Sequence, residues 1–174
     1  MWSDATRNVA NINYQHSSGA MGVTSETTVQ FSVAGGTRFE LDGNSRISLS
    51  NNDSGTSNTI FGKSTATSLD AGSNYNVFVG EGIATGSMND ATYNTGVGYQ
   101  ALKSVTSGDF NVALGSRSGE DLSVGSLNTF VGDYSGHTTT SAQRTVAVVH
   151  SAMATGNVDT DAIGTVAIGY EALT

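Results

Sequence analysis

Short apolar blocks, six of the seven closed by a glycine, recur along the chain from residue 58 onward. Residues 76–80 read Asn-Val-Phe-Val-Gly, and residues 94–98 read Asn-Thr-Gly-Val-Gly. Side chains of a strand alternate between the two faces of its sheet. The middle residue of each block therefore faces one way and its two neighbours face the other, and both faces are apolar or Thr. A strand of this kind is predicted to be covered on both faces.

The blocks belong to seven units with a nearly constant length. Their closing residues, which we call anchors, step along the chain by 18, 18, 17, 17, 17 and 20 residues. A unit of this length cannot bury a core alone, but stacked units can. The anchors are Gly62, Gly80, Gly98, Gly115, Gly132, Val149 and Gly169.

The predicted fold class is all-β, with a repetitive β-solenoid, β-roll or triple β-prism of 17–18-residue rungs. One face of each strand can fill the interior of the coil. The other face needs a cover, and another copy of the same chain is the simplest one, so we expect an intertwined assembly. The sequence leaves open whether each chain coils alone or several chains wind together. Val149 and the 20-residue step after it leave open whether the last two rungs stack regularly.

The predicted repeat core consists of the Asn that opens each of the first five blocks, the apolar residue before each anchor, and the six glycine anchors. Glycine suits a sharp turn with positive φ at the end of a strand. The Asn residues are either ordinary turn residues or an amide ladder that runs from rung to rung. The predicted core residues are Asn58, Phe61, Gly62, Asn76, Val79, Gly80, Asn94, Val97, Gly98, Asn111, Leu114, Gly115, Asn128, Val131, Gly132, Val148, Ile168 and Gly169.

Residues 1–57 do not share the period and are predicted to be a separate N-terminal β-meander of about five strands. Val29, Phe31 and Val33 alternate with polar residues, which is typical of a strand with one buried face. We therefore expect two domains, residues 1–57 and residues 58–174. The meander strands are predicted around residues 11–16, 21–23, 28–33, 38–42 and 46–50.

Composition limits the classes of function. The apolar fraction is 37%, below the ~45–50% of most globular domains. Gly accounts for 22 of the 174 residues, Pro and Cys are missing, and the net charge is −8. Because the seven Lys and Arg residues form no cluster, we expect no nucleic-acid partner. No apolar run approaches the ~18 residues of a membrane span, so no membrane insertion is expected.

The histidines show no metal-ligand spacing. They are His16, His137 and His150, and His150 takes a place that Tyr occupies in other units. We predict no metal and no cofactor. Two alternatives stay open, an axial metal held by three copies of one His, and loose Ca²⁺ binding at Asp-rich turns.

Candidate catalytic residues are equally sparse, and we predict that the chain is not an enzyme. Glu120-Asp121 and Asp159 with Asp161 are the carboxylate pairs that a glycosidase dyad would need. Acids in polar turns are more often solvated charges. Thr-rich segments at residues 65–67 and 138–140 fall at different places in their units, which argues against the regular Thr rows of an ice-binding face.

The units resemble repeats of bacteriophage tail fibres, in particular those of marine and cyanobacterial phages. Residues 94–102 (Asn-Thr-Gly-Val-Gly-Tyr-Gln-Ala-Leu) carry this resemblance. Residues 14–16, Met21 and residues 39–44 are similar to a module that often precedes such repeats. More loosely, residues 165–169 (Thr-Val-Ala-Ile-Gly) resemble repeats in the heads of trimeric autotransporter adhesins.

The resemblance implies a homotrimer with a fibre axis, located in the tail fibre of a virion. It implies other virion tail proteins at the N-terminal end and a host surface receptor at the distal end. Because the array reaches residue 174 without a visible cap, we expect a longer fibre whose distal tip is missing from this sequence. The predicted function is a shaft segment that presents a receptor-binding tip for host attachment. The alternatives are a bacterial trimeric adhesin head and a β-helical polysaccharide depolymerase.

Overall fold

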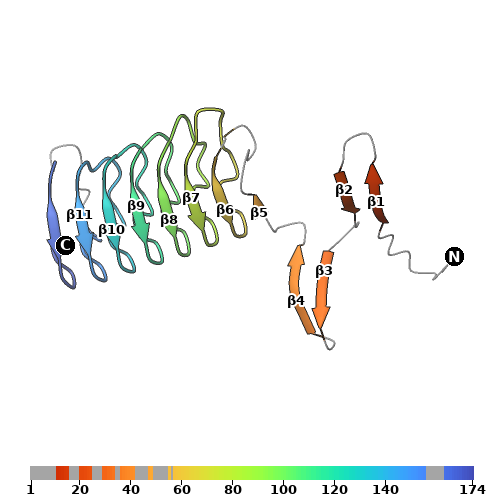
Figure 1. Cartoon of the computed structure of the whole chain (residues 1–174). Coiled ribbons are helices and arrows are strands. Elements are labelled where there is room, and N and C mark those ends of the chain that lie inside the picture. Colours follow the sequence, from red (N-terminus) through yellow and green to blue (C-terminus); the bar gives the residue numbers. More distant parts are fainter. Residues whose placement is uncertain are drawn as a thin grey trace. The chain divides into compact units, whose positions relative to one another are not determined.

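The structure is a computed structural model of the chain, and the residues that it describes are all-β (Figure 1). It describes residue 55 and the ranges 57–155 and 163–174 in full, and the backbone of five strands before residue 55. The chain divides into two compact units, residues 1–45 and residues 46–174.

The first unit contains two separate antiparallel strand pairs. β1 (Asn11–Gln15) pairs with β2 (Ala20–Thr24), and β3 (Val29–Val33) pairs with β4 (Gly36–Leu41). A register irregularity lies between Phe31 and Ser32 in β3. The alternating pattern thus predicted the strands well, whereas their assembly into one continuous meander stays a prediction.

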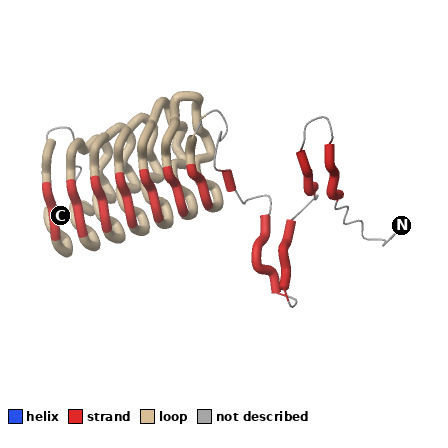
Figure 2. Tube along the Cα trace, in the orientation of Figure 1, coloured by secondary structure: helices blue, strands red, loops and turns tan. Residues whose placement is uncertain are grey.

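The second unit is a β-solenoid in which seven three-residue strands stack in sequence order (Figures 1 and 2). Each strand pairs in parallel with the next, so a single chain forms the whole stack by coiling on itself. The strands are β6 (Thr59–Phe61), β7 (Val77–Val79), β8 (Thr95–Val97), β9 (Val112–Leu114), β10 (Thr129–Val131), β11 (Val146–Val148) and β12 (Val166–Ile168).

One further strand precedes the repeats in this unit. β5 (Ile47–Ser48) pairs antiparallel with β6, at the first rung of the stack. The second unit therefore begins at residue 46, whereas the sequence placed the domain boundary between residues 57 and 58.

The middle residue of every strand points into the solenoid. These residues are in register from rung to rung, for example Phe78 opposite Gly96 and Phe130 opposite Ala113. Large and small side chains share the interior: a Cβ at Gly96 would lie 3.2 Å from the Phe78 ring. The buried middle residues are Ile60, Phe78, Gly96, Ala113, Phe130, Ala147 and Ala167.

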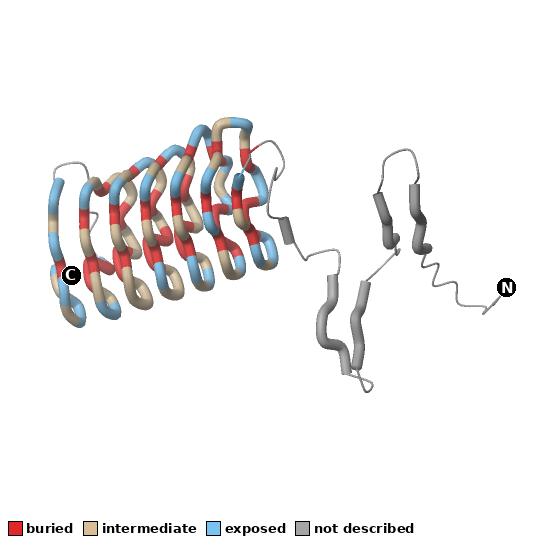
Figure 3. Tube along the Cα trace, in the orientation of Figure 1, coloured by how far each residue is buried: buried red, intermediate tan, exposed pale blue. Residues whose placement is uncertain are grey.

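The segment after each anchor supplies the other wall of the core (Figure 3). Ala101, Leu102 and Val105 are fully buried there, and Leu122 and Met153 occupy related places in later rungs. This explains the loosely repeated second half of each unit, where small or apolar residues recur. The apolar core thus runs along the interior of the whole stack.

The strands of the last two rungs pair as regularly as the earlier strands, a point that the sequence left open. Val146, Ala147 and Val148 of β11 pair in register with Val166, Ala167 and Ile168 of β12. At the break in the pattern, Val149 has a φ of 91°, compared with 128–144° at the glycine anchors. The backbone at this anchor accommodates a side chain by changing its conformation.

Candidate functional site

The most distinctive surface of the solenoid is the outer face of its stacked strands. The residues on either side of each buried middle residue point outward, as strand geometry requires. Phe61 is 54% exposed and Ile168 is 67% exposed, while Val97 and Leu114 are each more than a third exposed. This face carries no charged side chain in any of the seven strands. Its residues are Thr59, Phe61, Val77, Val79, Thr95, Val97, Val112, Leu114, Thr129, Val131, Val146, Val148, Val166 and Ile168.

The predicted repeat core falls into three groups in space. The Asn residues are fully buried, the anchors form the corner after each strand, and the apolar residues before the anchors lie on the outer face. Phe61, Val79, Val97, Leu114, Val131, Val148 and Ile168 are therefore not interior residues of this chain. The reason is the period of two: when the middle residue of a three-residue strand is buried, its neighbours cannot be.

The amide ladder that the sequence left open is confirmed. The Oδ1 atom of Asn94 accepts hydrogen bonds from the backbone N and the Nδ2 atom of Asn111, each at 3.0 Å. Asn111 Nδ2 also donates to the carbonyl of Gly125 at 2.8 Å. Asn111 and Asn128 repeat the pattern, and Thr145 ends it by donating its backbone N–H to Asn128 Oδ1 at 3.0 Å. Each Asn thus ties two rungs together inside the solenoid.

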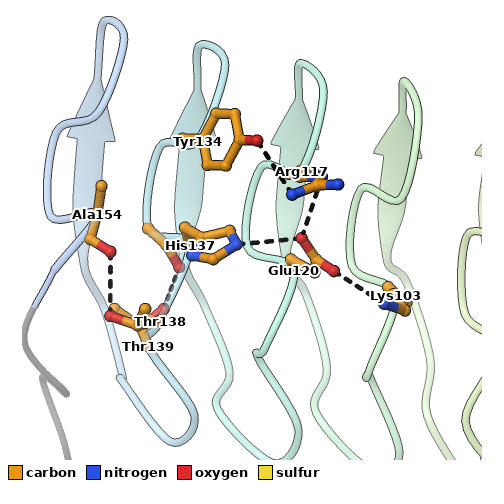
Figure 4. A network of polar contacts seen from close by, with 9 residues as sticks. Lys103, Arg117, Glu120, Tyr134, His137, Thr138, Thr139 and Ala154 are labelled. Atoms are coloured by element: carbon orange, nitrogen blue, oxygen red, sulfur yellow. Dashed lines mark hydrogen bonds and ion pairs between the residues drawn. The ribbon is translucent and has the colours of Figure 1, made fainter.

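A second polar cluster lies on the flank of the solenoid, across three successive rungs (Figure 4). Glu120 is only 7% exposed. Its carboxylate accepts a hydrogen bond from Lys103 Nζ at 2.9 Å and lies 3.1 Å from His137 Nε2 and 3.6 Å from Arg117 Nε. Burial alone would raise the pKa of Glu120. The Lys103 hydrogen bond and the charges of Lys103, His137 and Arg117 outweigh this effect and lower the pKa below its ordinary value of 4.5.

This environment bears on the carboxylate pairs considered for a glycosidase. A general acid needs a raised pKa so that it still holds a proton near neutral pH. Glu120 has the opposite shift, so its surroundings favour a structural ion cluster over proton donation. The other pair, Asp159 and Asp161, lies outside the described residues.

His137 and His150 take part in contacts between rungs. His137 faces Glu120, while His150 lies 3.2 Å from Asp133 and stacks on the ring of Tyr170 at 5.7 Å. His16 is not among the residues whose side chains are described. In the part of the chain that the structure describes, no group of three or more His, Cys, Asp or Glu side chains is arranged to hold a metal ion.

The Thr-rich segments form no exposed row. Thr65 is buried and donates to the carbonyl of Gly80 at 2.7 Å, and Thr139 is buried and donates to the carbonyl of Gly136 at 2.7 Å. Thr138, which precedes Thr139, donates to the carbonyl of Ala154 at 3.2 Å. These hydroxyls satisfy backbone carbonyls of the solenoid, which is a structural role.

A column of exposed rings, which was not predicted from the sequence, lies at the corner before the strands. Tyr75, Tyr93 and Phe110 each lie five residues before an anchor and have φ values of 56–61°. Tyr93 stacks between the other two rings, with centroid distances of 4.9 Å on both sides. Leu127 follows at the equivalent place in the next rung. Reading the repeat backward from each anchor would have shown this column in the sequence.

No family model, no curated protein and no solved structure matches this chain. Across the described residues, the structure has no helix with the length and apolarity needed to cross a membrane.

Proposed function

We propose that this chain is a shaft segment of a homotrimeric bacteriophage tail fibre, with its N-terminal end toward other virion tail proteins and a receptor-binding tip at its distal end. The observation that supports the proposal best is the uncharged, apolar outer face of β6 to β12. A shaft needs a rigid repeated element and a surface through which copies associate. The solenoid offers a candidate for each.

The outer face and the adjoining ring column leave a large apolar area in water. Phe61, Tyr75, Tyr93 and Phe110 are 49–54% exposed. An aromatic side chain buries about 150–250 Å² when fully covered, so these four rings alone leave roughly 300–500 Å² in water. The largest apolar patch on a typical monomer is about 300–600 Å². The exposed Val, Leu and Ile side chains of the outer face add further apolar area to that of the four rings. An area of this size favours an association surface.

The spacing of the face favours another copy of this chain as the cover. Its side chains repeat with every rung, at the ~4.8 Å distance between paired strands. A partner that fits every rung needs the same axial repeat, and a second copy has it by construction. The absence of charge on the face removes like-charge repulsion between copies. That there are three copies is the part of the proposal that comes from the resemblance to phage fibres.

Rigidity follows from the contacts between rungs. Seven rungs at ~4.8 Å make a rod of about 30 Å. The rungs are joined by parallel strand pairing, by the buried amide ladder and, on the flank, by the Glu120 cluster. A rod of this kind can hold a distal tip away from a virion while it resists shear.

Location tests the function directly. Antibodies raised against residues 58–174 are expected to label fibres on phage particles in immunoelectron microscopy of a producing culture. Labelling of the bacterial surface instead, with unlabelled particles, would contradict the proposal. It would favour the adhesin head, the alternative to which residues 165–169 point.

A further inference from the structure

The ring column differs from the rest of the repeat because it does not extend through the whole array. Tyr75, Tyr93, Phe110 and Leu127 occupy this corner in the second to fifth rungs, and all are about half exposed. The first rung has Ser57 at the same place, and the sixth has Arg144, which is exposed. The column is therefore an apolar segment with a polar residue at each end.

The outer face of the strands fixes the axial position of one copy against another less sharply than the ring column does. Its outward residues are Thr or Val before the buried middle residue, and Val, Leu, Ile or Phe after it. From the second rung onward, moving one copy along another by one rung would exchange Thr for Val and Val for Leu or Ile, which changes the contact little; only at the first rung is a large side chain, Phe61, exchanged for a smaller one, Val79. A repetitive interface is prone to such slippage, as weakly specified strands are in general.

We propose that the column formed by Tyr75, Tyr93, Phe110 and Leu127 packs against neighbouring copies of this chain and sets the axial register of the assembly. In register, the apolar columns of all copies are at the same height, with Ser57 and Arg144 beyond their ends. A slip of one rung brings Arg144 of one copy to the height of Leu127 in the next. It also leaves one ring at the other end without an apolar neighbour. This inference rests on the proposed function, because the occupant is a second copy.

The stacking of the rings argues against a glycan as the occupant. Sugars pack on the open face of an aromatic ring, but both faces of the Tyr93 ring are covered by Tyr75 and Phe110 at interplanar angles of 13° and 5°. At the middle of the column, the Tyr93 ring can therefore expose only its edge. A ring edge suits the side chains of another protein surface with the same rung spacing.

Cysteine cross-linking can read the register, because the chain has no cysteine of its own. Val97→Cys and Leu114→Cys each place one thiol on the outer face, in adjacent rungs. The two variants, one with a mass tag, are refolded together and oxidised. An assembly in register joins two copies of the same variant, whereas a slip of one rung joins a Val97→Cys chain to a Leu114→Cys chain. We expect such mixed links to be a small minority in the otherwise unchanged chain.

The column is then removed by Tyr75→Ser, Tyr93→Ser and Phe110→Ser, because Ser57 already adopts the same backbone conformation with a φ of 58°. The expected result is an assembly of unchanged mass in which mixed links rise several-fold. The matched control is Tyr99→Ser with Tyr170→Ser, which removes exposed rings beyond the other end of the strands. It should leave the proportion of mixed links unchanged.

Two results would overturn the inference, and they differ in what they say of the proposed function. An assembled triple variant with an unchanged proportion of mixed links would overturn the register role and leave the fibre proposal standing. A monomeric parent chain without cross-links would overturn both. If the triple variant does not assemble, the single Phe110→Ser variant carries the same test.

Discussion

At the scale of single residues, the glycine anchors show how tightly the rungs approach. Gly98 has a φ of +132°, and a Cβ there would lie 2.4 Å from the carbonyl oxygen of Gly115 in the next rung. Any side chain would meet backbone that cannot move without disturbing the next rung. Glycine is thus required by space as well as by backbone conformation.

Gly98→Ala is therefore expected to lower the free energy of unfolding by more than the about 1–2 kcal/mol that left-handed backbone alone costs. The matched control is Gly164→Ala, since Gly164 also has a positive φ, +83°, but a Cβ there would meet no atom of the described residues within 4 Å. Chemical denaturation measures both. Equal losses in the two variants would contradict the role of close rung contact.

The amide ladder makes an equally specific prediction. Asn111→Ala removes the acceptor for the backbone N–H of Asn128 and the donor to the carbonyl of Gly125. A buried polar group without a partner costs about 1–3 kcal/mol, and this substitution creates more than one. Asn89→Ala, at an exposed Asn, is the control and should change stability by less than about 0.5 kcal/mol. A small effect at Asn111, similar to the control, would show that the ladder is dispensable.

Not every residue-scale feature could be predicted. The buried Asn and the glycine corners follow from one residue type that recurs at a fixed place. Leu102 and Met153, in contrast, are buried with φ values of 48° and 54°, although such conformations are unfavourable for their side chains. Neighbouring rungs impose this backbone, because Leu102 donates its N–H to the carbonyl of Ser118 at 3.0 Å. The residue propensities of a single rung cannot predict this conformation, because it depends on hydrogen bonds to the next rung.

At the scale of elements, alternation predicted the strands and their two faces but not which face is buried. Both faces of a block such as Val77-Phe78-Val79 are apolar, so pattern alone gives no preference. The structure buries the middle residue of the block and leaves its two neighbours on the outer face. The corner with the ring column was missed because Tyr, Phe and Leu are not residues expected at positive φ.

The ion cluster joins three rungs and gives this element of the fold a pH dependence. The pKa of Glu120 is lower in the folded chain than its ordinary value, so its contribution is complete above about pH 4.5 and is lost as the pH falls through the folded pKa. Glu120→Gln should remove this part of the stability loss between neutral pH and acid, as measured by thermal unfolding across that range.

Glu81→Gln provides the comparison for Glu120. Glu81 faces Lys63 at 3.9 Å, but both side chains are more than half exposed, and pairs of this kind contribute little. Its acid unfolding profile should stay close to that of the parent chain. If Glu120→Gln and Glu81→Gln unfold with the same profile as the parent chain, the cluster does not stabilise the stack.

At the scale of the whole molecule, seven anchors at nearly equal spacing correctly predicted an all-β stack of short rungs, but left open whether it is a β-solenoid, a β-roll or a triple β-prism. The structure shows a β-solenoid. The structure adds that one chain coils on itself. Neither the repeat pattern of the sequence nor the structure of a single chain shows whether copies associate. We propose this association because the outer face of the strands, from Thr59 to Ile168, is apolar and uncharged.

The mass of the purified chain in solution tests this central proposal most directly. Light scattering is expected to give three times the chain mass of 17.8 kDa, because covering the outer face and the ring column removes a large apolar area from water. A stable particle of 17.8 kDa, with that face left in water, would contradict the account.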